Sequence, residues 1–576
     1  ASASVVFYVR NNSWLWNEKF RCALDFSTFT FNGVTCEINA IDDSLAALIK
    51  AKKGTQYEYS VDVIKESTLL RYDRLEMDNK AEWTFAQDEE NRLFETISKA
   101  SLFVPLYLTS SEIANYNTVD FGDSSFGGSE GVAYDNLPYI ISNISGKYGY
   151  NVHFSTEFDI WSKATQYCKF KLLGYFPGND TPTVYWESSV LETDPGKKER
   201  VNIDIIIPLA INAKVVFVIE DPYYHNSFPA KFIEVHKMPV ATFVSRGEMI
   251  DIPVTTPLKL LNRLLKSMNG GNDGITGTIA RTDERLNNTV LVSAESIRGI
   301  KNAKLYTSYN KFVEWMSAEF GFVPVTGEKS VSFVHRDSLF GEKVIKELEN
   351  CTDFEFSVDA SRIYSRVNVG YEKVDYESVN GKDEFRFTQQ YTTGVTLSDS
   401  SLDLTSPYRA DAYGIEFLAS KRGEDTTDND SDNDVFMVGV YASDGVYRLD
   451  RSRTIEGVIS PGSMFNVMYS QLYMIRANER YFASMCGTLE FASSNGNSEV
   501  MIDGEALNGD VSVGDALFTV GEMSVSTDDL DIPTDLSGKV TFKYNGRGYE
   551  GFVNEVTLNI GRGERVTYDM IVKSVE

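Results

Sequence analysis

The sequence predicts a mainly β, multidomain protein with a few short helices, which places it in the β-rich α+β class. Most segments are short runs of β-branched and aromatic residues bounded by turn residues. Only a few stretches show the spacing of an amphipathic helix. The chain has 576 residues, and at roughly 100–200 residues per domain this length corresponds to about three to five domains.

The first segment, residues 1–105, is expected to form an N-terminal β-rich domain. Residues 21–31 alternate and are rich in aromatics, Asn32-Gly33 is a type I′ hairpin signal, and residues 34–41 return as a second strand. Asp42, Asp43 and Ser44 offer N-caps to a helix over 45–52 that ends at Gly54. Residues 56–64 favour another strand, and residues 88–99 favour a second helix.

The second segment, residues 106–245, has a different pattern of predicted strands and turns. Short aromatic strands alternate with turn clusters at 121–128, 179–182 and 194–198. Regular spacing of this kind predicts an inserted, jelly-roll-like β-sandwich module. The most apolar stretch, 203–219, is interrupted by polar residues and proline, so it predicts two buried strands and a turn rather than a membrane span.

Helices return in the third segment, residues 246–395, which is expected to be an α+β domain. Thr256 can cap a helix that has Pro257 at its first position and ends at Asn269-Gly270-Gly271. Its apolar stripe consists of Leu258, Leu261, Leu264, Leu265 and Met268. A second helix over 308–320 directs Phe312, Trp315, Met316 and Phe320 inward and ends at Gly321. Strands are expected at 330–335, 354–358, 365–371 and 383–390.

The last two segments are residues 396–486 and 487–576. The first combines an acidic loop at 424–434, a strand at 435–441 and a helix at 463–484 that follows Pro461-Gly462. The second is expected to be a small β-barrel or sandwich with strands at 539–544, 549–554 and 565–572. Asn545-Gly546 marks a tight turn between the first two of these strands.

The charge balance restricts the possible partners. The formal net charge is -28, which argues against a surface that neutralises nucleic-acid phosphates. A channel lined with carboxylates would instead let a duplex pass without binding it, although solubility is the simpler explanation of the charge.

Cysteine usage indicates a reducing compartment. Cys22 and Cys36 lie close enough in sequence to face each other across a hairpin, but reduced core thiols are favoured for them and for Cys168, Cys351 and Cys486. The chain is therefore expected to fold in the cytoplasm. Residues 1–10 show no cleavable signal.

No motif predicts catalytic, cofactor-binding or metal-binding residues. Asp428, Asp430, Asp432 and Asp434 have calcium-loop spacing, but Asn433 and Gly439 occupy the positions that require Gly and Glu. The kinase-like triplet at 335–337 and the phosphate-loop-like stretch at 271–278 lack the required partner residues.

Single reactive residues give equally weak signals. The histidines, at 153, 225, 236 and 335, show no metal-ligand spacing and are interpreted as ordinary surface or core residues. Acid pairs such as Glu89-Glu90 and Asp528-Asp529 arise by chance among 83 acids, so a glycosidase dyad has no support but stays open. The aromatics Tyr185, Trp186, Tyr223 and Tyr224 are of the type that stacks on sugars, although a core or interface role is favoured.

Three regions resemble the tail-hub or tail-tip (baseplate) proteins of tailed bacteriophages, of the type found in Bacteroidetes phages and prophages. They cover most of the chain outside 106–245. The first contains CEINAIDDSLAALIKA; the second contains YNKFVEWMSAEFGFVPV, YSRVNVGYEKVDY and EDTTDNDSDNDVFMVGV; the third is GKVTFKYNGRGYEGFVNEVTLNIGRGERVTYDMIV.

The resemblance implies a non-enzymatic structural protein of the virion tail, made in the host cytoplasm. Hub-like β-barrel domains would assemble as a ring, usually a trimer, that forms or caps the DNA passage during ejection. Its partners would be the tube, tail-tip and fibre proteins, and the DNA would pass without specific binding. The 106–245 module would project and bind a neighbouring tail protein or a host glycan. Two alternatives stay open, a carbohydrate-binding or adhesin-type surface protein and a β-domain glycoside hydrolase or lyase.

Overall fold

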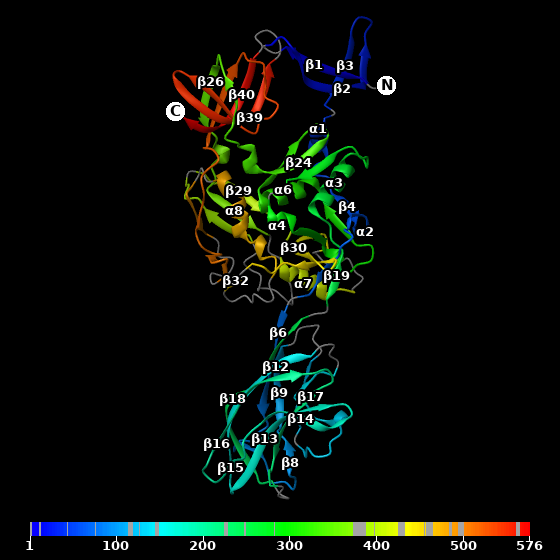
Figure 1. Ribbon diagram of the computed structural model, residues 1–576, viewed down its shortest axis with the longest axis vertical. Coiled ribbons are helices and arrows are strands. Elements are labelled where there is room, and N and C mark those ends of the chain that lie inside the picture. Colours follow the sequence, from blue (N-terminus) through cyan, green and yellow to red (C-terminus); the bar gives the residue numbers. More distant parts are fainter. Residues whose placement is uncertain are drawn as a thin grey trace. The chain divides into compact units, whose positions relative to one another are not determined.

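The computed structural model describes residues 3–10, 13–42, 44–74, 76–112, 119–125, 127–144, 149–223, 228–246, 249–280, 283–371, 388–396, 398–423, 432–453, 455–456, 465–482, 486–492, 500–559 and 565–576. The chain forms two compact units (Figure 1). The sandwich unit is Asp73–Met249, and the core unit combines Ala1–Tyr72 with Ile250–Glu576. The expected β-rich multidomain fold with few short helices is confirmed.

The sandwich unit consists of two sheets that enclose its main apolar core, and a smaller cluster of Phe103, Leu137, Leu173, Val216 and Val218 is separate from it. The first sheet has the order β16 (Glu199–Leu209), β12 (Tyr150–Ser162), β18 (Lys231–Arg246), β6 (Glu76–Phe85) and β9 (Leu106–Glu112), with β7 (Arg92–Phe94) beside β18. The second has the order β10 (Asp120–Phe121), β11 (Ile141–Ser142), β17 (Lys214–Glu220), β13 (Gln166–Phe176) and β14 (Asn179–Glu187), with β8 (Ser101–Phe103) and β15 (Leu191–Thr193) paired alongside.

Alternation along the strands places the core between these sheets. On β12, Phe154, Phe158 and Ile160 are fully buried, whereas His153 and Trp161 lie on the outer face. The apolar stretch 203–219 forms two strands, as predicted, and they belong to different sheets. No helix in the described ranges is long and apolar enough to cross a membrane.

The sandwich unit begins earlier than the expected boundary at residue 106. Strand β6 pairs with both β18 and β9, so residues 73–105 pack with this unit. The helix predicted over 88–99 is wrong. The Asp88 carboxylate accepts the backbone N–H groups of Glu90 and Arg92, which forms a turn, and the following strand β7 buries Leu93 and Phe94 in the sandwich.

In each unit, the strand by which the chain leaves and the strand by which it returns are paired with each other. In the core unit, β5 (Leu70–Tyr72) and β19 (Ile250–Ile252) are antiparallel, with Tyr72 opposite Ile250. In the sandwich unit, the start of β6 pairs with the end of β18, with Glu76 opposite Arg246. The exit and the return of the chain are therefore neighbours on both sides of the crossing.

The core unit packs its sheets around a helical centre. Its helices are α1 (Leu45–Lys52), α2 (Val61–Ile64), α3 (Pro257–Met268), α4 (Glu284–Asn287), α5 (Ala294–Arg298), α6 (Tyr309–Phe320), α7 (Ala412–Ser420) and α8 (Gln471–Phe482). Short 3-10 turns lie at Arg336–Leu339, Ala360–Arg362 and Val467–Tyr469.

The core unit contains five sheets besides the N-terminal and C-terminal ones. Their orders are β19-β5-β31-β30-β21, β20-β24-β23, β22-β4, β29-β27-β28-β33-β36 and β32-β34-β35. The strands not yet bounded are β4 (Tyr57–Ser60), β20 (Thr276–Ile279), β21 (Thr289–Ser293), β22 (Lys304–Thr307), β23 (Phe322–Thr326), β24 (Ser330–His335), β27 (Arg366–Gly370), β28 (Gln389–Thr392), β29 (Ser401–Thr405), β30 (Val435–Ser443), β31 (Val446–Leu449), β32 (Ile455–Glu456), β33 (Thr488–Phe491), β34 (Met501–Ile502), β35 (Glu505–Ala506) and β36 (Val511–Ser512).

The two predicted amphipathic helices form this centre. Helix α6 begins at the Ser308 cap, ends at Gly321 with φ of 69°, and buries the four predicted side chains completely. Helix α3 forms as predicted except that Leu260, rather than Leu258, lies on its buried face. The Thr256 hydroxyl does not cap α3; it donates to Glu66 Oε1 at 2.9 Å.

The C-terminal sheet of the core unit has six strands in the order β25 (Val344–Leu348), β38 (Lys539–Tyr544), β39 (Arg547–Asn559), β40 (Arg565–Val575), β37 (Gly521–Thr527) and β26 (Thr352–Val358). Asn545 and Gly546 have φ of 50° and 81°, so the predicted tight turn joins Tyr544 directly to its partner Arg547. Strands β25 and β26 lie at the two ends of the sheet order.

The N-terminal sheet contains β1 (Ser4–Arg10), β2 (Trp16–Phe31) and β3 (Cys36–Ile41). The hairpin forms, but the type I′ turn predicted at Asn32-Gly33 is wrong. Pairing ends at Phe31 and Cys36, and the Asn32 carboxamide oxygen accepts from the backbone N–H groups of Val34 and Thr35. The side chain thus closes a longer, four-residue loop.

Several predicted elements differ in extent. The strand at 56–64 ends at Ser60 and continues as α2. The helix at 463–484 is replaced by the 3-10 turn and α8, and most of the strand at 383–390 lies outside the described residues, as do 424–431 of the acidic loop.

Candidate functional site

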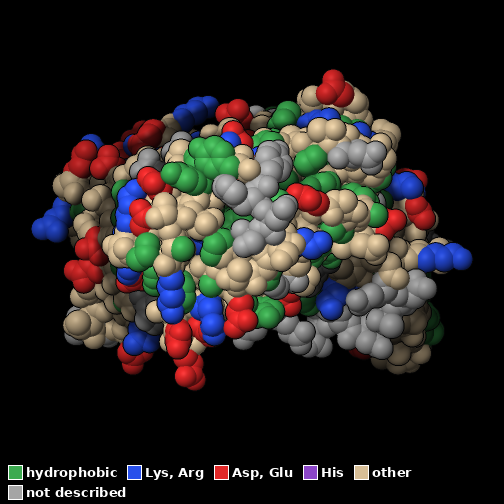
Figure 2. All heavy atoms as spheres, turned by 90° about the horizontal axis from the view of Figure 1, so that it is seen from below, with side chains coloured by type: hydrophobic (Ala, Val, Ile, Leu, Met, Phe, Trp, Pro, Cys, Tyr) green, Lys and Arg blue, Asp and Glu red, His purple; other side chains and the backbone are tan. Residues whose placement is uncertain are grey.

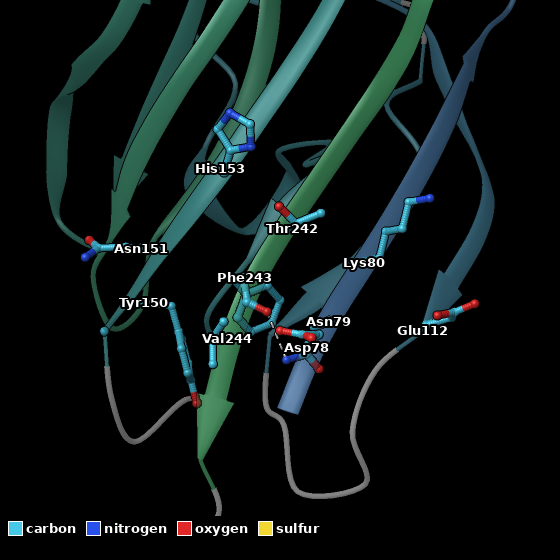
Figure 3. Close-up of a pocket in the computed structure, with 11 residues that line it drawn as sticks. Asp78, Asn79, Lys80, Glu112, Tyr150, Asn151, His153, Thr242, Phe243 and Val244 are labelled. Atoms are coloured by element: carbon cyan, nitrogen blue, oxygen red, sulfur yellow. Dashed lines mark hydrogen bonds between the residues drawn. The ribbon is translucent and has the colours of Figure 1, made fainter. Parts of the chain in front are cut away.

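The first sandwich sheet has a cleft at one end, with a cavity volume of about 690 Å³, lined by side chains from both faces of the sheet (Figure 3). It lies over β12, β18, β6 and β9. Its lining residues are Asp78, Asn79, Lys80, Glu112, Gly149, Tyr150, Asn151, His153, Thr242, Phe243 and Val244. This volume lies within the range of about 300–1,000 Å³ that is typical of small-molecule sites.

Strand register creates a polar row across this cleft. His153 lies opposite Thr242, Thr242 opposite Lys80, and Lys80 opposite Glu112. The His153 ring contacts Asp204 at 2.5 Å, and the Lys80 ammonium pairs with Glu82. An imidazole, a hydroxyl, an ammonium and a carboxylate thus come from four different strands.

An aromatic pair and a buried amide form the lower part of the cleft. The rings of Tyr150 and Phe243 meet edge to face with centroids 5.2 Å apart. Asn79 is buried, and its amide donates to the Phe243 carbonyl at 3.3 Å and to Ser245 Oγ at 2.9 Å, which fixes this part of the sheet. In Figure 3, the Tyr150 ring and the Asn151 amide lie on the opposite side of the cleft from Lys80 and Glu112. An aromatic ring beside amide and hydroxyl groups is suited to an amphipathic, hydroxyl-bearing ligand.

A charged network lies on the same sheet. Arg200 pairs with both Glu157 and Asp159, and His236 Nε2 contacts Asp159 at 2.9 Å. The Arg200 guanidinium, with His236, holds the pKa of Asp159 below its ordinary value. His153 and His236 therefore each contact one carboxylate, and among the described residues no group of three potential ligands could hold a metal ion. His225 lies outside the described residues.

The sequence-predicted aromatics do not line this cleft. Tyr185 and Trp186 are half-buried against the sandwich core. Tyr223 is 58% exposed and meets Tyr167 edge to face at 5.1 Å, and Tyr224 lies outside the described residues. Sequence reasoning missed Tyr150 and Asn151, because only the fold brings them into one lining with Phe243 and Val244.

The calcium-loop residues that the structure describes hold the fold together. Asp432 accepts two contacts from Arg298 Nη1, at 2.5 and 2.7 Å, and both side chains are buried. Asp434 lies 3.7 Å from the Arg409 guanidinium. Asp428 and Asp430 lie outside the described residues.

The kinase-like triplet at 335–337 and the phosphate-loop-like stretch at 271–278 also have packing roles. Arg336 donates to Asn478 Oδ1 at 2.9 Å and to Ser317 Oγ at 2.7 Å, and burial lowers its pKa. A Cβ on Gly277 would approach within 2.7 Å of Leu261, so this glycine permits α3 to lie against β20.

All five cysteines are free thiols. Cys22 is buried and Cys36 is exposed on β3, so they do not form a pair across the hairpin. Burial raises the pKa of Cys168 to about 11 and also raises that of Cys351, which disfavours the thiolate that a nucleophile needs.

No family model and no curated protein sequence matches the chain. Among solved structures, the prophage tail protein gp18 from Listeria monocytogenes EGD-e matches 72% of this chain and 94% of its own, at 10% identity and a TM-score of 0.21. Murine APRIL matches 29% of this chain and 98% of its own, at 4% identity and a TM-score of 0.18. The PRD1 vertex protein P5 matches 29% and 95%, at 10% identity and a TM-score of 0.15. These scores lie below 0.5, so none of the three likenesses establishes a shared fold or function.

Proposed function

We propose that this chain is a non-enzymatic structural component of a bacteriophage tail, in the hub or baseplate, where it forms or caps the DNA passage and docks other tail proteins. The proposal takes its class of protein from the sequence resemblance of three regions that lie in the core unit. It takes its physical support from the exposed apolar surface of that unit.

The observation that carries the proposal is the N-terminal sheet. Its exposed large apolar side chains are Phe7, Tyr8, Trp14, Leu15, Trp16, Phe20, Phe26, Phe29, Phe31, Val34 and Ile41, each exposed by 42% or more. Monomeric soluble proteins rarely expose contiguous apolar patches larger than a few hundred Å², and larger ones mark interfaces. A three-stranded sheet with this surface is suited to burial in an assembly.

The net charge, and not a concentrated acidic surface, supports passage of DNA without binding. The net charge is -28, yet Figure 2 shows acidic, basic and apolar side chains interspersed on one face of the molecule. The surplus of acid is therefore not gathered into a single field on that face. Carboxylates gathered around a central opening would repel the phosphates of a passing duplex.

Electron microscopy of the full-length chain tests the proposal. Negative-stain class averages at high protein concentration should show rings, with three-fold symmetry for the usual hub arrangement, around a central opening. Particles that stay monomeric at every concentration, without a ring in any class, would contradict it.

A second candidate function, carbohydrate binding, is favoured by the cleft of the sandwich unit. Tyr150 lies at the end of the cleft with its ring packed on Phe243, and Asn151, His153 and Thr242 offer hydrogen-bonding groups elsewhere in the lining. A glycan array probed with the full-length chain should identify a ligand whose binding is lost in Tyr150→Ala. The matched control is Tyr223→Ala, which removes an exposed tyrosine outside the cleft. Equal loss in both variants, or no ligand at all, would exclude this function.

A further inference from the structure

Strand β26 forms an open edge of the C-terminal sheet. Among the described strands it pairs with β37 alone, and its register sets Val358 opposite Gly521. Just beyond the strand, the Asp359 N–H donates to the Val520 carbonyl at 2.9 Å, so Asp359 belongs to a hydrogen-bonded pair. Such pairs alternate with non-hydrogen-bonded pairs along antiparallel strands, so the backbone groups of Phe356 and Val358 point away from β37. This edge can therefore accept a further strand.

Both faces of this edge strand are exposed. Phe356 and Val358 share one face, where they are 50% and 56% exposed. Glu355 and Ser357 share the other face and are also exposed. Phe356 lies opposite Met523 of β37, whose side chain belongs to the buried core of this sheet. The apolar face of the sheet thus continues onto β26 and is exposed there, and an added strand with apolar side chains on this face would bury it.

The opposite face of β26 borders an acidic groove of about 400 Å³. Register aligns Glu355 with Ser524, Ser524 with Asp569, and Asp569 with Glu555. Glu522 lines the same groove, on the same face of β37 as Ser524. The groove therefore gathers four carboxylates, one from each of the strands β26, β37, β40 and β39.

The charges of this groove are not balanced within the described part of the chain. None of the four carboxylates forms an ion pair with another described residue, and the lining includes the cation Arg362, whose Nε pairs with Asp359 at 3.1 Å. No group of three potential ligands among the described residues could hold a metal ion. The complementary cation is therefore an ammonium or guanidinium group, which a lysine or arginine side chain of a partner supplies.

We propose that β26 binds an extended segment of a partner protein in which lysine or arginine alternates with apolar residues. Because the side chains of a strand point alternately to its two faces, the basic residues lie over the groove while the apolar residues lie beside Phe356 and Val358. The backbone of the segment pairs with the outward-pointing groups of the same two residues. The proposal deepens the proposed function, and it rests on that function only for the role of the partner as another tail protein.

Fluorescence anisotropy of labelled peptides with the full-length chain tests this two-faced match. The probe is a peptide that alternates lysine and valine over about eight residues, within the usual length of a strand. Its matched control has the same composition, with the lysines and the valines in two separate blocks. The alternating peptide should bind at least about tenfold more tightly, and its affinity should fall as the salt concentration rises. Equal affinity of the two peptides, or no binding of the alternating one, would overturn the proposal.

A proline variant assigns the binding to the strand edge. Val358→Pro removes an N–H that points away from β37, so β26 can still pair with β37 while pairing with the peptide is blocked. Val358→Ala keeps this N–H and is the matched control for the lost side chain. The proline should weaken binding of the alternating peptide about fivefold more than the alanine does. Equal binding by two variants with the same thermal transition would exclude the edge as the site.

A charge variant assigns the basic side chains to the groove. The double variant Glu355→Gln/Glu522→Gln removes two of the four carboxylates and should weaken binding of the alternating peptide about two- to thirtyfold. Glu490→Gln is the matched control, because Glu490 is exposed on β33 of a different sheet. An affinity of the double variant equal to that of Glu490→Gln would overturn the proposal. The ring test of the proposed function uses the chain without peptide, so either idea can fail while the other stands.

Discussion

The buried ion pair between Arg298 and Asp432 provides a quantitative test of the core unit. Both side chains are almost inaccessible, at 1% and 6% exposure, and Arg298 Nη1 lies 2.5 and 2.7 Å from the two carboxylate oxygens. Asp432→Asn removes the charge of the partner and leaves the guanidinium buried. Breaking a buried pair in this way costs about 3–5 kcal/mol of unfolding free energy.

The corresponding thermal shift follows from the size of the unit. Unfolding entropy is about 2.1 cal/mol/K per residue, so a unit of roughly 400 residues that unfolds cooperatively has about 0.8 kcal/mol/K. The expected fall in Tm is therefore about 4–6 °C. Differential scanning calorimetry measures it, and the transition of the sandwich unit serves as an internal reference because Asp432 lies outside that unit.

Two controls separate loss of the pair from loss of packing. The double variant Arg298→Met/Asp432→Leu removes both charges, and we expect it to recover most of the lost stability. Glu58→Gln breaks the solvent-exposed pair with Lys304, and we expect a change below about 0.5 kcal/mol. A shift below 1 °C in Asp432→Asn would refute the claim that this pair holds the end of α5 against the start of β30.

Three further outcomes are expected. Arg200 lowers the pKa of Asp159 in the folded sandwich unit, so the stability that this carboxylate contributes is present above about pH 4 and is lost as the pH falls through its folded pKa. In Asp159→Asn, the fall of Tm at acidic pH should therefore become less steep. A fall of Tm at acidic pH equal to that of the wild type would be inconsistent with the ion pair. Cys36 should react with iodoacetamide at pH 8 in the native protein while Cys168, whose pKa is about 11, reacts only after unfolding, as mass spectrometry of the modified peptides can show. Gly321→Ala should lower the stability of the core unit by more than about 1 kcal/mol, because Gly321 has φ of 69° and a Cβ would lie 2.4 Å from the Ala477 carbonyl oxygen; a chemical-denaturation midpoint equal to wild type would disprove this.

The parts of the fold that sequence predicted well are those fixed by local interactions. Helix α6 is bounded by Ser308 and Gly321, and its inward residues recur at helical spacing, so both its ends and its buried face follow from a short window. The Asn545-Gly546 turn is equally local, because both residues adopt the positive φ that this turn requires. The same reasoning failed at Asn32, whose side chain accepts two backbone hydrogen bonds and so favours a longer loop.

The failures concern strands whose partners are distant in sequence. Strand β7 carries apolar residues that a helix would also accommodate, and its pairing with β18, about 140 residues further on, decides between the two. The candidate cleft shows the same limit. His153, Thr242 and Lys80 become neighbours only through the register of β12, β18 and β6, and nothing within any one strand predicts that register.

The paired crossing between the units has a consequence for how such a chain can diversify. Tyr72 and Ile250 face each other across two strands, so a short turn between them would replace the whole of Asp73–Met249 and leave the strand pairing of the core unit intact. A recombination event at these two points would exchange the sandwich unit for another module of unrelated sequence, provided that the N- and C-terminal ends of the new module are adjacent. An exchange of this kind would change the surface of the sandwich unit without altering the residues that pack around α6.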